Sequence, residues 1–307
     1  MVQIVRVLVR YVVHKSYIRR LLCVMKMYLP LTIVYEFFIS LGSGLAGAML
    51  GLGGGVFMVP LLVFLMGVPI KIAAGASILA VVATSSAAAA TYVRDEITNM
   101  RLGMFLELAT TVGAVTGALV TASVSESALS TVFGLTLFYA SAVMYQQTRR
   151  VGRSWVATQN DGLANRLHLE GQYYDKARSE WITYGVSKTP VTFGISYVAG
   201  VVSGLLGIGG GGIKVPAMNV VGGVPMKVAV ATSNFMIGVT AAASALVYIR
   251  NGFCDAFVAG PVMLGTLLGA FTGARLTGRV RGVFLKKVFV VVLALIAARM
   301  ILLGAGV

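Results

Sequence analysis

Gly51-Leu52-Gly53-Gly54-Gly55-Val56-Phe57-Met58-Val59-Pro60 recurs as Gly207-Ile208-Gly209-Gly210-Gly211-Gly212-Ile213-Lys214-Val215-Pro216. The two glycine segments are 156 positions apart (207 − 51), and the offset holds without a gap far beyond them. The further matches are Gly67-Val68-Pro69 with Gly223-Val224-Pro225, Lys71 with Lys227, Ser77 with Ser233, Thr84 with Thr240, and Gly113 and Gly117 with Gly269 and Gly273. A match of this length predicts an internal duplication.

The composition is that of a membrane protein. Of the 307 residues, 58% are hydrophobic and 11% are charged, whereas soluble domains carry about 25% charged residues. Long apolar runs broken by short polar loops predict an all-α polytopic membrane protein in the lipid bilayer. The net charge of +15 comes from the N-terminus, the central linker and one late loop, so membrane topology explains it better than nucleic-acid binding.

Four regions are expected: a basic extension (1–28), a first transmembrane repeat (29–148), a polar basic linker (149–188) and a second transmembrane repeat (189–307). The extension is a poor signal peptide. One interpretation of this segment is a basic amphipathic surface helix. The alternative is that the natural chain begins at Met25 or Met27. Cys23 and Cys254 predict neither a disulfide framework nor a metal site.

The apolar runs predict eight spanning helices and two short half-helices, one after each glycine segment. The runs are about 29–50, 56–66, 72–93, 102–122, 127–148, 189–206, 213–222, 228–249, 256–276 and 283–304. If the short runs cross, each repeat has five crossings and the repeats are inverted. If they are re-entrant, each has four and the repeats are parallel. Neither arrangement puts every basic cluster inside, and we favour inversion.

The glycine segments are the first candidate substrate site. A non-helical backbone at membrane depth must be buried in protein or line a cavity. Consecutive glycines allow positive φ and close approach to a ligand, and N–H groups at the start of a helix attract anions. We expect Gly53, Gly54 and Gly55, with Gly209, Gly210, Gly211 and Gly212, to bind substrate. The alternative is close GxxxG-type helix packing.

Lys214 is the most informative charged residue, because it follows the second glycine segment inside an apolar run. A cation at membrane depth is costly and marks a functional candidate, although a lysine can also snorkel to the interface. Ser77, Ser233 and Asn234 lie early in the next helices. Their hydroxyl and amide groups could grip an oxyanion or join helices.

Glu36 and Glu107 lie within spanning runs and are candidates for proton coupling, or lie at the interface. The apolar cores contain no GxSxG, no HExxH and no histidine. No catalytic residue, no metal ligand and no cofactor is therefore expected, and the chain is not predicted to be an enzyme.

The chain resembles the TauE/SafE (sulfite exporter, TSUP) permease family over about 28–304. The resemblance is carried by Gly44-Leu45-Ala46-Gly47 through Pro60, by Ser203 through Pro216, and by Val228-Ala229-Val230-Ala231-Thr232-Ser233-Asn234. It implies a multi-pass permease of the bacterial cytoplasmic (inner) membrane with eight spanning helices. Its implied substrates are small, mostly sulfur-containing anions, normally moved outward. Lys214 departs from the apolar residue expected there.

The function expected from these features is secondary transport, and export, of a small anion such as sulfite or an organosulfonate. Alternating access around the paired broken helices would move it. The alternatives are a passive anion channel and a permease of the same family for a different small solute. The expected partners are the anion and the lipid bilayer, and a homo-oligomer stays open.

Overall fold

The computed structural model describes residues 31–48, 54–149, 159–175, 179–276 and 282–306. The basic extension and Gly53 lie outside these ranges. Seven of the described helices are long and apolar enough to cross a membrane, and two apolar stretches, Gly55–Met66 and Phe289–Gly304, are shorter. The sequence predicted eight spanning helices and two short ones.

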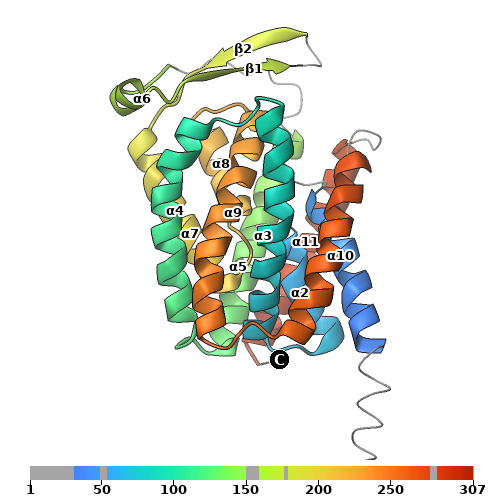
Figure 1. Ribbon diagram of the computed structural model, residues 1–307. Helices are drawn as coiled ribbons and strands as arrows, with labels where there is room; N and C mark the ends of the chain where they lie inside the picture. Colours follow the sequence, from blue (N-terminus) through green and yellow to red (C-terminus); the bar gives the residue numbers. More distant parts are fainter. Residues whose placement is uncertain (1–30, 49–53, 150–158, 176–178, 277–281, 307) are drawn as a thin grey trace, which may run out of the picture.

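The helices follow the predicted runs closely. The first half contains a first helix at Leu31–Ala48, α2 at Gly55–Met66, α3 at Ile70–Arg94, α4 at Met100–Thr121 and α5 at Glu126–Arg149. The second contains α7 at Thr189–Leu206, α8 at Gly211–Pro216 continued by a π-helical turn at Ala217–Val221, α9 at Met226–Arg250, α10 at Ala256–Leu276 and α11 at Gly282–Gly304. Together they form one upright bundle (Figure 1).

The matching helices α3 and α9 pack against each other in opposite directions (Figure 1). Near the start of α3, the Lys71 ammonium lies 5.6 Å from the Phe253 ring, just beyond the end of α9. At the other end, the Asn99 N–H donates to the Thr232 hydroxyl near the start of α9. The two helices are therefore antiparallel, as the inverted arrangement predicts, and the inverted repeat itself stays a prediction.

One helix of each half packs on the other half. The α4 glycines Gly113 and Gly117 leave no room for a Cβ because backbone carbonyls of α7, at Tyr197 and Val201, lie against them. In the same way, Gly269 and Gly273 of α10 lie against backbone carbonyls of the first helix, at Leu41 and Leu45. Each contact recurs at the offset of 156, and small residues allow this close approach of helices.

The glycine segments bend the chain back inside the bundle. Gly54, Gly207, Gly209 and Gly210 have φ values of 75°, 72°, 78° and 72°, a left-handed conformation that glycine adopts readily. A Cβ on Gly55 would lie 3.2 Å from the carbonyl oxygen of Gly207. The two segments therefore meet, and α2 and α8 begin inside the bundle.

The linker forms a small cap that the sequence analysis did not expect. It contains the helix α6 (Gly162–Leu167) and the antiparallel strands β1 (Gly171–Asp175) and β2 (Glu180–Tyr184) (Figure 1). The Lys227 ammonium lies 2.6 Å from the Asp175 carboxylate. The Asn99 amide donates to the Leu169 carbonyl. The cap is therefore fixed to the ends of α4 and α9.

Asp161 joins the cap to α7. Its carboxylate accepts hydrogen bonds from the N–H groups of Ala164 and Thr189 and from the Thr189 hydroxyl. Partial burial raises the pKa of Asp161, but the hydrogen bonds outweigh burial and hold the pKa below its usual value. The carboxylate thus caps α6 and the start of α7 at once.

Candidate functional site

Lys214 is fully buried among the spanning helices, with an exposed fraction of 0%. Gly210, in a left-handed conformation, is the N-cap of α8, and the Lys214 side chain of this helix is buried. Its ammonium donates a hydrogen bond of 2.7 Å to the Thr240 hydroxyl and lies 4.0 Å from Glu107 Oε2. The lysine does not snorkel to an interface in this conformation.

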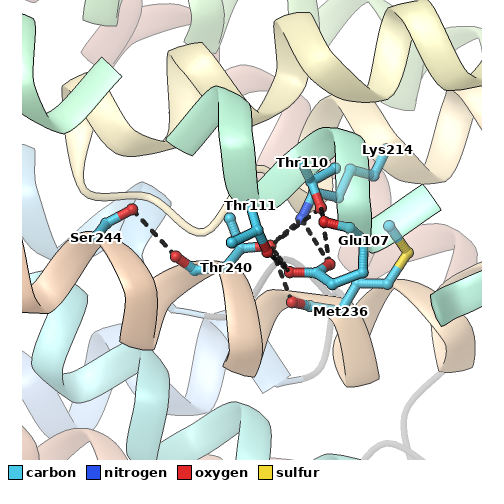
Figure 2. Close-up of polar contacts among 7 residues, drawn as sticks. All are labelled: Glu107, Thr110, Thr111, Lys214, Met236, Thr240 and Ser244. Carbon is cyan, nitrogen blue, oxygen red and sulfur yellow. Dashed lines mark hydrogen bonds and ion pairs between the residues drawn. The ribbon is translucent and has the colours of Figure 1, made fainter. Parts of the chain in front are cut away.

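Glu107 faces Lys214 from α4, although α4 belongs to the first half of the chain (Figure 2). Oε2 accepts a hydrogen bond of 2.7 Å from Thr110, and Oε1 accepts bonds of 2.8 Å from Thr111 and 2.7 Å from Thr240. Thr110 and Thr111 are three and four residues further along α4, so they share its face. Both carboxylate oxygens are satisfied.

Thr240 joins the two charges from α9 (Figure 2). Thr240 Oγ1 accepts the Lys214 hydrogen bond and lies 2.7 Å from Glu107 Oε1 and 2.9 Å from the Met236 carbonyl oxygen, the two acceptors available to its single proton. Ser244 donates to the Thr240 carbonyl. Helices α4, α8 and α9 thus each contribute to one polar cluster.

The cluster combines one ammonium with hydroxyl groups that are buried among the helices, and oxyanion binding there stays a prediction. Charge-assisted hydrogen bonds to such groups are short and strong. Within the described ranges, no group of three or more His, Cys, Asp and Glu side chains could hold a metal ion. We name Lys214, Glu107, Thr110, Thr111 and Thr240 the lysine cluster.

The glycines next to the lysine cluster pack tightly. A Cβ on Gly210 would lie 3.0 Å from Ser203 Cβ and 3.4 Å from Lys214 Cε, and one on Gly209 would lie 2.9 Å from Ile237 Cγ2. A Cβ on Gly54 would lie 3.3 Å from Thr266 Cγ2, whereas a Cβ on Gly212 would have only Ala140 Cβ nearby, at 3.6 Å. Close packing therefore explains why glycine stands at Gly210, Gly209 and Gly54. Anion binding by the N–H groups of Gly54, Gly55 and Gly209 through Gly212 stays a prediction, and Gly53 lies outside the described residues.

The three predicted polar residues behave differently. Ser77 donates a hydrogen bond of 2.9 Å to the Gly207 carbonyl, so it ties α3 to the opposite glycine segment. Asn234 donates to the Val230 carbonyl of its own helix. The buried Ser233 hydroxyl has no hydrogen-bond partner among the described residues. None of the three is bonded to Lys214.

Glu36 is buried in the first helix, with an exposed fraction of 4%. The first helix packs on α10, where the Phe37 carbonyl lies against Gly265. Lys214 and Thr240 belong to α8 and α9, so the structure brings Glu107 to the lysine cluster and does not bring Glu36 there. Its coupling role stays a prediction without a partner in this cluster.

The sequence analysis did not select the threonines of the lysine cluster. Thr110 and Thr111 follow Glu107 at helical spacing, a signal that could have been used. Thr240 had been noted only as the match of Thr84. No sequence signal placed it between Lys214 and Glu107.

Comparison with known proteins agrees with a multi-pass membrane protein. The sulfite exporter TauE/SafE family matches residues 36–300. A Bacillus subtilis protein described as probable membrane transporter protein YunE is 27% identical over 275 residues, covering 87% of this chain and 96% of its own. A probable membrane transporter protein of Xylella fastidiosa is 26% identical over 251 residues, covering 80% and 87%. No solved structure matches the chain. The chain belongs to the sulfite exporter TauE/SafE family.

Proposed function

We propose that this protein is a secondary transporter that exports a small oxyanion, such as sulfite or an organosulfonate, across the bacterial cytoplasmic membrane. The family membership and the relatives described as probable membrane transporters support transport. The oxyanion class is supported by the chemistry of the lysine cluster.

The observation that carries this proposal is the full burial of Lys214 with its ammonium on Thr240 and near Glu107. An ionised group among spanning helices is costly and is typical of a substrate or ion pathway. An ammonium with three donors and nearby hydroxyl groups complements the oxygens of sulfite or a sulfonate.

We also propose that the halves are inverted repeats that rock against each other around the lysine cluster. The recurrence of helix contacts at the offset of 156 and the opposite directions of α3 and α9 support this arrangement. Transporters of this kind bind substrate near the midplane, between broken helices. The basic linker suggests that the capped end is cytoplasmic, and α10 ends at the same end (Figure 1).

The test is flux of sulfite, sulfate and ethanesulfonate in proteoliposomes. We expect saturable flux for one of the sulfur oxyanions and a large loss in Lys214→Ala. Lys71→Ala is the matched control, because Lys71 donates to the Ala122 carbonyl at an exposed position outside the lysine cluster. No flux of any of these anions in either direction would overturn the oxyanion assignment. Non-saturating flux with single-channel currents would favour a channel.

A further inference from the structure

The carboxylate of Glu107 already occupies the position that an oxyanion would take in the lysine cluster. It accepts three hydroxyl hydrogen bonds of 2.7 to 2.8 Å, from Thr110, Thr111 and Thr240, and it faces the Lys214 ammonium at 4.0 Å. These are the interactions that would hold a bound sulfite or sulfonate. In this conformation the site is therefore filled by the protein's own anion.

The charge balance of the cluster limits how a second anion can enter. Lys214 and Glu107 cancel, and both are buried, with exposed fractions of 0% and 7%. Adding a monoanion would leave one uncompensated negative charge among spanning helices, which is strongly unfavourable. Protonation of Glu107 removes that charge and frees Lys214 to pair with the incoming anion.

No other charged group among the described residues of the neighbouring helices lies near enough to compensate. Glu107 and Lys214 lie on α4 and α8, which pack against α7, α9 and α5. In α9 the ionisable residues are Lys227 near the start and Tyr248 and Arg250 near the end. In α4 and α7 they are Arg101 at the start of α4, Lys188 just before α7, and Tyr197 within α7. In α5 they are Glu126, Tyr139, Tyr145 and Arg149. Lys214 is the cation within 4.0 Å of the carboxylate.

We propose that Glu107 is a proton-exchanging placeholder for the transported anion, so that each monoanion moves together with one proton. This inference rests on the proposed oxyanion transport. In the step, a proton from water binds one oxygen of Glu107, the Glu107 contact with Lys214 is released, and the anion takes its place on Lys214 and Thr240. When the anion leaves, Glu107 loses the proton and pairs with Lys214 again. No net charge crosses in the loaded state, so the direction follows the summed gradients of anion and proton, and export takes place when the outward anion gradient exceeds the opposing proton gradient.

The test uses proteoliposomes with ethanesulfonate, which stays a monoanion at every pH used, and with sulfite. For the wild type we expect ethanesulfonate to accumulate by about tenfold for each pH unit of imposed gradient. One proton should enter with each anion. A membrane potential set with potassium and valinomycin should not change the accumulation ratio. For Glu107→Gln we expect accumulation to fall to a ratio of one, and the remaining exchange of labelled anion no longer to depend on the pH gradient. Glu126→Gln is the control, since Glu126 lies exposed at the start of α5.

The outcomes separate the two proposals. Absence of flux of both anions in the wild type would overturn the proposed function and this inference with it. Flux without protons in the wild type would overturn the inference alone. Full proton-driven accumulation by Glu107→Gln, or its loss in Glu36→Gln instead, would also overturn the inference. If Glu107→Gln does not fold, the proton-to-anion ratio of the wild type decides.

Discussion

The two halves carry different side chains at the positions of the lysine cluster, and only one of the two sets is charged. Lys214, Glu107, Thr110 and Thr240 of the lysine cluster correspond at the offset of 156 to Met58, Met263, Thr266 and Thr84. In the second set, the Thr266 hydroxyl lies 3.7 Å from Met58 Sδ. Thr110 and Thr240 are matched by threonines, whereas Thr111 corresponds to Leu267 and the two charges have no counterpart.

This difference indicates which features the fold needs. Met58 and Thr266 are both 0% exposed, and neither side chain is ionisable. The glycine contacts of α4 and α10 are also the same in both halves. Because a buried ion pair adds little net stability compared with well-packed apolar residues, we infer that the fold does not require Lys214 and Glu107 and that their role is functional.

The largest expected effect on stability comes from removing one charge alone. Lys214→Met copies Met58 but leaves the Glu107 carboxylate buried without its cation, which costs about 3–5 kcal/mol of unfolding free energy. Met58→Leu, the control in the other half, should cost less than about 1.5 kcal/mol. Thermal unfolding of the purified protein in detergent measures both. Equal losses of unfolding free energy in Lys214→Met and Met58→Leu would mean that the buried charges do not make the two sites different in stability.

A smaller difference is expected between the matched threonines. Thr110→Val removes a hydrogen bond to a carboxylate, worth about 1.5–3 kcal/mol. Thr266→Val removes bonds to the Val262 carbonyl and the Met58 sulfur, worth about 0.5–1.5 kcal/mol. Unfolding in detergent should rank Thr110→Val as the more harmful substitution. The reverse order would argue against an ionised Glu107 in the folded protein.

Glycine substitutions should separate packed positions from open ones. A Cβ on Gly55 would lie 2.7 Å from Ser77 Oγ and 3.0 Å from Val81 Cγ2, whereas one on Gly212 would meet only Ala140 at 3.6 Å. Gly55→Ala should therefore cost about 1–3 kcal/mol by overpacking, and Gly212→Ala should be tolerated. Expression and thermal unfolding check this. Tolerance of Gly55→Ala would mean that the two glycine segments do not meet as described.

The smallest expected effect concerns the cap, which is fixed to the starts of α4 and α9. Asp161→Ala removes the N-cap of α6, at a cost of about 1 kcal/mol. Since the folded pKa of Asp161 is lowered, its contribution is complete above the unfolded pKa of about 3.9. It is lost as the pH falls through the lower, folded value. Unfolding measured from pH 7 to pH 3 should show a smaller pH dependence in Asp161→Ala than in the wild type.

The sequence predicted the positions of the helices because apolar runs are local signals, and the crossing directions stay a prediction. The matching glycines at Gly113 and Gly269 indicated the duplication, but not which helices they join. Each of α4 and α10 packs on the opposite half, so the offset alone could not pair Glu107 of the first half with Lys214 of the second. The β-hairpin at Gly171–Tyr184 was missed because its polar strands lie in a linker read only for charge.

The most direct test of the account replaces both charges by the residues of the other half. Lys214→Met combined with Glu107→Met gives both charged positions the residues found at Met58 and Met263. The account predicts stability close to that of the wild type and sulfite or ethanesulfonate flux lower by roughly thirtyfold or more, as expected for the loss of at least 2 kcal/mol of binding. A stable double variant that carries the anion at the wild-type rate would contradict it.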